Sequence, residues 1–250
     1  MRKIVLTGFI LAVISAQTFA VRPFITDDAA VTGHRQFQLE TWTLFDRNAS
    51  EHWMMWGYGP LENLEVAIGL LWGHDRVNNR LSLAAPLLEA KYLFRPYESG
   101  RGPGLAISAG TFLPFGSGDF QEDYWGAYSI FILTQALGRD ESILIHGNLG
   151  MNFLNTTNRR EHWTPFWGIG TQIRTFGGLH LVGEIISGDP YVPASGLAYH
   201  VGFRHFISDY FQVDLTFGDS LQRGEYALPF WFGFGVRLVF CPERRQARRM

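Results

Sequence analysis

The stretch FWFGFGVRLVF, residues 230–240, divides into two faces when its side chains are assigned to alternate sides of a β-strand. One face carries Phe230, Phe232, Phe234, Val236, Leu238 and Phe240, and the other carries Trp231, Gly233, Gly235, Arg237 and Val239. The first face is entirely apolar, whereas the second is mostly small and holds one guanidinium group. In a soluble sheet the apolar face would lie in the protein core. In an outer-membrane barrel it would contact lipid, and the second face would line the lumen.

The same alternation recurs along the chain, and no helical spacing of comparable length competes with it. Twelve strands are expected, most with the ~9–11 residues that a tilted strand needs to cross a bilayer. They lie at 36–46, 51–59, 63–73, 84–95, 104–115, 125–137, 141–154, 164–176, 179–187, 197–207, 211–218 and 229–240. We therefore predict an all-β fold, a single antiparallel transmembrane β-barrel over residues 36–240.

The connections between these strands differ in length and composition. Those after the second, fourth, sixth, eighth and tenth strands are mostly short turns, such as GRDE at 138–141 and GG at 177–178. Those after the third, fifth, seventh, ninth and eleventh strands are longer and more polar, such as HDRVNNRLSLAAP at 74–86. This sorting predicts short periplasmic turns on one rim and longer extracellular loops on the other.

Both ends of the chain differ from the barrel. Residues 1–20 have a basic start, an apolar run and small residues before Ala20, which predicts a secretory signal peptide and export to the bacterial outer membrane. No stretch approaches 18 consecutive apolar residues, which argues against a helical membrane span. Residues 241–250, CPERRQARRM, form a basic C-terminal tail whose expected state is disorder, with contact to an anionic surface as the alternative.

Composition gives few further indications. The formal charge of −2 does not predict nucleic-acid binding. The single cysteine, Cys241, cannot form an internal disulfide, and no spacing suggests a metal site or a cofactor. The partners expected during assembly follow from the last strand: Gly235 and Phe240 resemble the C-terminal signal read by the barrel-assembly machinery, which receives barrels from periplasmic chaperones. Outer-membrane lipids are the expected surroundings of the folded chain.

The segment RPFITDDAAVTGHRQFQLE, residues 22–40, resembles the start of a family of outer-membrane transporter-like barrels associated with the meta-pathway of phenol degradation. The matching residues are Arg22, Pro23, Thr26, Asp27, Asp28, Ala29, Gly33, Gln38 and Glu40. The resemblance implies a barrel that passes hydrophobic or aromatic compounds. We place residues 21–35 before the barrel, on the periplasmic side.

The adjacent carboxylates of Asp27 and Asp28 have two interpretations. They could hold a cation or pair with lumen arginines as a small plug. The alternative, which we favour, is that Thr26, Asp27 and Asp28 form a turn or a helix N-cap that sets the start of the first strand.

The parity of the strands predicts which polar side chains line the lumen. They are Glu40, Glu65, Glu89, Lys91, Arg95, His146, Asn148, Asn152, Gln172, Arg174, His180, Glu184, His200, Arg204, Gln212, Asp214 and Arg237. Both signs of charge occur, so neither an anion filter nor a cation filter follows. If Ile207 pairs with Phe211 across the turn at 208–210, Arg204 lies opposite Asp214. We predict an ion pair there, whose role is more often structural than functional.

A barrel of twelve strands is narrow, and inward Trp42, Leu44, Leu71, Phe112 and Trp231 would narrow it further. We therefore expect a passive channel for small, hydrophobic or aromatic molecules that uses no cofactor, no metal and no catalytic residue. Two other classes stay open: a structural or adhesive barrel, and an outer-membrane lipid hydrolase. The hydrolase is disfavoured because no serine lies in a recognisable nucleophile setting beside a histidine.

Overall fold

The structure is a computed structural model that describes residues 24–121, 125–138, 140–155, 163–191, 195–224 and 227–241. The predicted signal peptide, Arg22, Pro23 and residues 242–250 of the predicted tail lie outside these ranges. Within the described ranges, no helix has the length and apolar character needed to cross a membrane.

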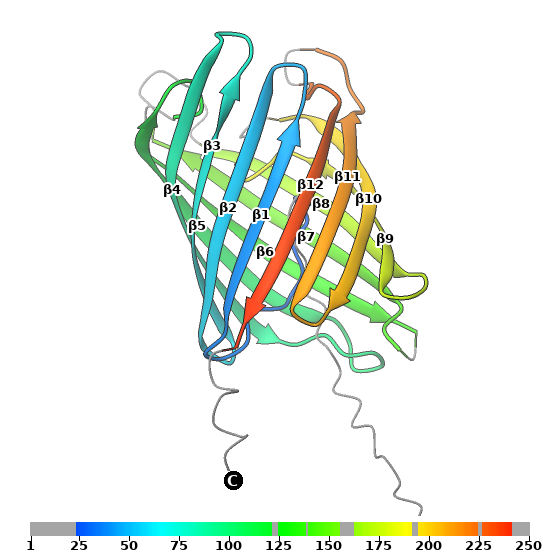
Figure 1. The fold of residues 1–250 in the computed structure, drawn as a ribbon. Coiled ribbons are helices and arrows are strands. Elements are labelled where there is room, and N and C mark those ends of the chain that lie inside the picture. The colour runs from blue at the N-terminus through cyan, green and yellow to red at the C-terminus, as the bar shows by residue number, and fades with distance from the viewer. Residues whose placement is uncertain are drawn as a thin grey trace, which may run out of the picture.

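Twelve antiparallel strands form one closed barrel, in which every strand pairs with its neighbours in the sequence (Figure 1). The predicted fold class and strand count are confirmed. The strands are β1 (Phe37–Phe45), β2 (Ala49–Leu61), β3 (Leu64–Asp75), β4 (Arg80–Arg95), β5 (Gly104–Ser117), β6 (Gly126–Leu137), β7 (Ile143–Leu154), β8 (Trp163–Arg174), β9 (Leu179–Ser187), β10 (Leu197–Ser208), β11 (Phe211–Ser220) and β12 (Trp231–Phe240).

The barrel closes through the pairing of β1 with β12, which runs from Phe37 opposite Phe240 to Phe45 opposite Phe232. Closure leaves no unpaired strand edge, which is the condition for a sheet to lie in hydrocarbon. Along β12 the side chain of Phe234 is 49% exposed, whereas Arg237 is buried. The apolar face of residues 230–240 is therefore the outer surface that contacts lipid.

The connections on the two rims of the barrel differ less consistently in length than the sequence predicted. The segment 74–86, expected to be a long loop, is mostly strand, because β3 continues to Asp75 and β4 begins at Arg80. The alternation continues through β4, where Leu81 and Leu83 are exposed and Ser82 is buried. Pro86 lies within an irregularity of the β4 pairing, where a missing N–H is tolerated.

An outward charge near the middle of β12 should destabilise the barrel strongly. We expect Phe234→Arg to lower the free energy of unfolding by about 2–4 kcal/mol, because a guanidinium in the hydrocarbon layer loses its hydration. Phe94→Arg, the matched control at the end of β4, should cost at most about 1 kcal/mol. Guanidinium unfolding in lipid bilayers measures both, and equal losses would contradict the assignment of this surface to lipid.

Candidate functional site

The lumen is occupied by the chain's own N-terminal segment, residues 24–35, which we call the plug. Figure 1 shows this blue segment inside the barrel, and Phe24, Ala29 and Val31 are buried there. The predicted position of this segment before the barrel is wrong for residues 24–33, whereas His34 and Arg35 are exposed. The segment lies in the lumen because side chains of the barrel wall satisfy the hydrogen bonds of its backbone groups. The pattern of residues in the segment itself does not reveal these contacts.

Wall side chains hold the first part of the plug by accepting hydrogen bonds from its backbone. Glu184 of β9 accepts one from the Ile25 N–H at 2.9 Å and one from the Thr26 N–H at 2.6 Å. Asn148 of β7 accepts from the Asp27 N–H at 2.7 Å and donates its amide to the Asp27 carbonyl at 2.9 Å. One carboxylate and one amide therefore fix three consecutive residues in the middle of the lumen.

The second part of the plug is held in the same way by side chains of β6 and β3. The Ala29 N–H donates to Thr134 Oγ1 at 2.9 Å, and the Thr32 N–H donates to Glu65 Oε2 at 2.6 Å. At the rim, the Arg35 N–H donates to the carbonyl of Gly59 at 2.7 Å. The plug is thus attached by separate side-chain contacts, and only its last residues join the sheet.

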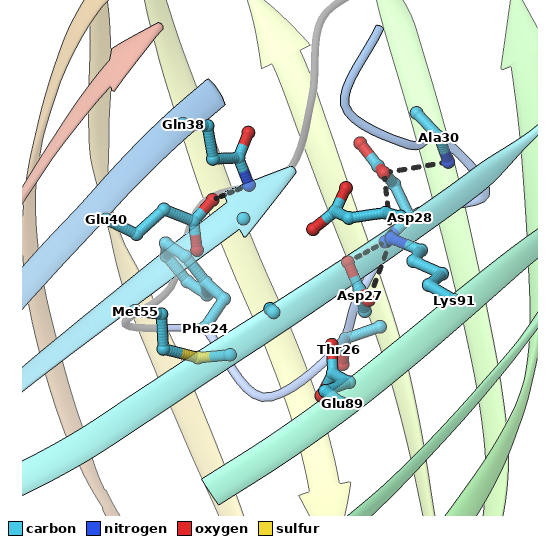
Figure 2. Close-up of a pocket in the computed structure, with 13 residues that line it drawn as sticks. Phe24, Thr26, Asp27, Asp28, Ala30, Gln38, Glu40, Met55, Glu89 and Lys91 are labelled. Atoms are coloured by element: carbon cyan, nitrogen blue, oxygen red, sulfur yellow. Dashed lines mark hydrogen bonds and ion pairs between the residues drawn. The ribbon is translucent and has the colours of Figure 1, made fainter. Parts of the chain in front are cut away.

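The carboxylates of the plug meet one wall lysine. Lys91 Nζ lies 2.9 Å from Asp27 Oδ2 and 3.7 Å from Asp28 Oδ1, as Figure 2 shows. The expected helix N-cap is absent, because the described part of the plug has no helix. The turn is present, since Asp28 Oδ1 accepts the Ala30 N–H at 3.1 Å. The interpretation that we favoured less, in which Asp27 and Asp28 pair with basic side chains of the lumen as a small plug, describes the geometry better. The partner is a lysine and not the expected arginine.

Glycines on the inner face of β8 make room for the plug. A Cβ built on Gly168 would lie 2.6 Å from Thr26 Oγ1, and one built on Gly170 would lie 3.3 Å from Thr26 Cβ. An inward side chain at position 168 would collide with the Thr26 hydroxyl, and one at position 170 would press on Thr26 Cβ. The lack of side chains at these two inward positions of β8 therefore allows the backbone of the plug to lie close to the strand.

A buried polar network lies on the wall beside the plug. Arg204 pairs in register with Asp214, and its Nε donates to Asp214 Oδ1 at 2.7 Å. This confirms the predicted ion pair. The pairing of Ile207 with Phe211 was wrong, because a bulge places Ser208 opposite Phe211. Arg204 Nη1 also donates to Gln172 Oε1 at 2.8 Å.

The structure places most of the predicted lumen residues inside the barrel. Buried there are Glu40, Glu89, Lys91, His146, Asn148, Asn152, Gln172, His180, Glu184, His200, Arg204, Gln212, Asp214 and Arg237, while Glu65 is partly buried beside the plug. Arg95 and Arg174 are exposed at the ends of β4 and β8. Arg174 Nη1 lies 3.6 Å from Asp140 Oδ2 in the adjoining turn. The predicted assembly residues lie on opposite faces of β12, with Gly235 inward and Phe240 outward.

A cluster of aromatic and aliphatic side chains packs inside the lumen and includes Ala29 of the plug. The rings of Trp42 and Trp53 stack with centroids 5.5 Å apart. Tyr191, from the connection after β9, contacts the rings of Trp53, Phe112 and Tyr128 at 5.3, 5.5 and 5.8 Å. This contribution of Tyr191 could not be predicted from the sequence, since DPY at 189–191 has the composition of an exposed turn.

The connection after β9 folds inward over residues 188–191, which we call the inward loop. Gly188 starts it with a φ of +82°, and a Cβ there would lie 2.5 Å from Phe166 Cβ, so only glycine fits. Asn152 Nδ2 donates to the carbonyl of Asp189 at 2.9 Å. The lumen is therefore obstructed twice, by the plug and by the inward loop.

Small cavities remain in the lumen. One of about 30 Å³ lies between the plug and strands β1–β4 and is the pocket drawn in Figure 2. Another of about 100 Å³ is lined by both Ile25 of the plug and Asp189 of the inward loop. In the part of the chain that the structure describes, no three His, Cys, Asp or Glu side chains are arranged to hold a metal ion.

A lipid-facing exterior, a closed antiparallel barrel and a polar lumen define the class of outer-membrane β-barrels. The chain belongs to the family described as "Putative MetA-pathway of phenol degradation", whose model matches residues 20–238. This confirms the family suggested by the sequence. No protein with a curated description matches the chain.

Solved structures with little sequence similarity share the fold. The COG4313 outer membrane channel from Pseudomonas putida F1 is 10% identical with a TM-score of 0.65, covering 85% of this chain and 98% of that one. The KdgM porin, in complex with disordered oligogalacturonate, is 7% identical with a TM-score of 0.61, covering 82% and 99%. The NanC porin is 7% identical with a TM-score of 0.54, covering 82% and 99%. The barrels that this chain resembles are thus channels and porins.

Proposed function

We propose that this protein is a gated channel that passes small, largely apolar solutes, aromatic compounds among them, when the plug moves aside. The observation that carries the proposal is how the plug is held. Side chains of the wall bind it through hydrogen bonds and one lysine, so it can leave without breaking the strand pairing that closes the barrel.

Two further observations support the choice of solute. The lumen beyond the plug is lined by aromatic and aliphatic side chains such as Trp42, Leu71 and Phe112, which favour apolar molecules. The family description refers to phenol degradation. We infer that diffusion is passive, and that the inward loop must also shift during passage.

A disulfide that locks the plug tests the proposal. A Cβ at position 168 would lie 3.6 Å from Thr26 Cβ, within the ~3.5–4.5 Å that a disulfide requires. Thr26→Cys and Gly168→Cys would be combined with Cys241→Ser, which removes the natural thiol. Uptake of phenol, benzyl alcohol and hexanol into liposomes would be measured with this variant oxidised and then reduced, and with wild type as the reference.

We expect the oxidised variant to take up these solutes at least tenfold more slowly than the same sample after reduction. Cys241→Ser alone is the matched control and should not respond to the reductant. Equal uptake in both states would show that the plug need not move. If wild type itself takes up none of the solutes, the channel is refuted and a structural barrel is the better description.

A further inference from the structure

The lumen wall binds the plug through groups that every peptide has. The two carboxylate oxygens of Glu184 accept the backbone N–H groups of Ile25 and Thr26 at 2.9 and 2.6 Å. The side-chain amide of Asn148 binds both backbone groups of Asp27, accepting its N–H at 2.7 Å and donating to its carbonyl at 2.9 Å. Because these bonds are made to main-chain atoms, they are available to any peptide whose backbone takes the same course through the lumen.

These bonds do not depend on the covalent link between the plug and the barrel. Glu184 lies 158 residues from Thr26 in the chain, and Glu65, which accepts the Thr32 N–H at 2.6 Å, lies 33 residues from Thr32. The wall would therefore meet the same donors and acceptors in a separate peptide. Such a peptide lacks the effective concentration of a tethered segment, which is in the millimolar range for a short flexible link. It should bind more weakly than the plug docks but with the same contacts.

Lys91 makes the wall selective for acidic residues at two consecutive positions. Its Nζ lies 2.9 Å from Asp27 Oδ2 and 3.7 Å from Asp28 Oδ1 (Figure 2). Lys91 and Asp28 are buried, where an ion pair is screened less by salt than on the surface. Asparagine at these two positions would keep the shape of the side chains but remove the carboxylates that face the lysine. An acidic peptide should therefore bind more tightly than its amide counterpart.

The wall also limits the size of the residue that precedes the acidic pair. Thr26 lies against Gly168 and Gly170 of β8, where a Cβ added to the first would lie 2.6 Å from Thr26 Oγ1 and one added to the second 3.3 Å from Thr26 Cβ. Strand β8 is paired on both sides, with β7 and β9, which restricts its movement outward. A small side chain fits at this position, and a large one prevents the segment from docking.

An aromatic ring two positions earlier completes the pattern. Phe24 is buried, its ring centroid lies 4.7 Å from that of His200, and Arg204 Cζ lies 5.6 Å from the same centroid of Phe24. A guanidinium within about 6 Å of the centroid of an aromatic ring is attracted to its face. The wall thus has separate places for a ring, a small residue and two carboxylates along one stretch of backbone.

We propose that the lumen wall is a binding site for short acidic peptides, and that the plug is its built-in occupant. The preferred sequence has an aromatic residue, a small residue two positions later and then two carboxylates, as in FITDDAAV at 24–31. The proposal rests on the proposed function in one respect, since the plug must leave before another peptide enters. A plug displaced by substitution allows the site to be tested without this spontaneous movement.

Calorimetric titration of the whole protein in non-ionic detergent tests this site. Thr26→Trp displaces the plug, and maleimide labelling of Val31→Cys in the Cys241→Ser background verifies the displacement. Three acetylated peptide amides are titrated: FITDDAAV, FITNNAAV, and FITDDAAV methylated on the backbone nitrogens of its threonine and its first aspartate. The methyl groups remove the N–H donors that Glu184 and Asn148 accept in the plug. Wild type, whose site is filled by its own plug, is titrated as well.

We expect the Thr26→Trp protein to bind FITDDAAV at least tenfold more tightly than either other peptide, and at least tenfold more tightly than wild type binds it. Adding Lys91→Met should reduce the preference for FITDDAAV over FITNNAAV to about twofold or less, because the charge that distinguishes them is gone. The matched control, Arg101→Gln, changes a basic residue in an exposed ion pair and should leave the preference as it is.

Equal binding of the three peptides, no binding of FITDDAAV, or equal binding to wild type and Thr26→Trp would overturn the site. Slow labelling of residue 31 in Thr26→Trp would also contradict it, since the wall would then accept an indole beside Gly168. If Thr26→Trp does not fold, Asp27→Lys with Asp28→Lys displaces the plug by repulsion from Lys91 and receives the same titrations. Because these measurements involve no passage, a failure of solute uptake in liposomes would refute the channel and leave the peptide site standing.

Discussion

Replacing Lys91 by methionine is expected to release the plug from the lumen. Lys91 is 6% exposed, and its Nζ lies 2.9 Å from Asp27 Oδ2 and 3.7 Å from Asp28 Oδ1. Without it, these carboxylates would remain in a buried site that also holds Glu65. Removing one member of a buried ion pair costs about 3–5 kcal/mol. The plug can avoid that cost by leaving, since its carboxylates are then hydrated.

The expected size of the effect follows from that cost. About 3–5 kcal/mol corresponds to a shift of roughly two to four orders of magnitude in the equilibrium between the docked and the released plug. The measurement is the rate at which a maleimide labels Val31→Cys, a smaller side chain at a buried plug position, in the Cys241→Ser background. We expect labelling to be at least tenfold faster in Lys91→Met, together with a larger single-channel conductance.

Two controls identify the cause of this release. Adding Asp27→Asn and Asp28→Asn to Lys91→Met removes the two negative charges that Lys91 faces in wild type and should slow the labelling again. Arg101→Gln breaks an exposed ion pair with Glu98 and should change nothing. Unchanged labelling of residue 31 in Lys91→Met would mean that the hydrogen bonds of the plug suffice without its ion pairs.

The strands of the barrel wall could be predicted from the sequence because apolar and polar residues alternate along them with a period of two. The inner and outer faces of each strand can be assigned from that strand alone. Residues 230–240, for example, predict that Gly233 and Arg237 point inward and that Phe234 points outward. Register across the turn after β10 was also predictable as far as Arg204 and Asp214. The bulge at Ile207 was not, since nothing in the turn sequence fixes which residue is left unpaired.

The segments that fill the lumen were harder to predict, because apolar and polar residues do not alternate regularly in the plug and the inward loop. Their position is set by partners more than 30 residues away in sequence, such as Glu184 for Thr26 and Asn152 for Asp189. One signal was nevertheless present. An inward Glu65 and Glu184 each present two carboxylate oxygens that need hydrogen-bond donors. A segment with free backbone N–H groups satisfies them.

Replacing Arg204 by methionine is expected to destabilise the barrel itself. Arg204 is 2% exposed, donates to Asp214 at 2.7 Å and to Gln172 at 2.8 Å, and its Cζ lies 5.6 Å from the ring centroid of Phe24. Its loss leaves Asp214 charged and buried, at a cost of about 3–5 kcal/mol. The measurement is the free energy of unfolding in guanidinium, followed by tryptophan fluorescence in lipid vesicles.

The second substitution in the same pair separates charge from packing. With Arg204→Met and Asp214→Leu together, no buried charge is stranded, and most of the lost stability should return. Arg174→Gln, an exposed arginine whose contact with Asp140 lies in a turn, should cost less than about 1 kcal/mol. If the double variant is no more stable than Arg204→Met alone, the arginine acts through its contacts with Gln172 and Phe24. In that case it would hold the plug in place as well as brace the wall, and labelling of residue 31 should accelerate in both variants.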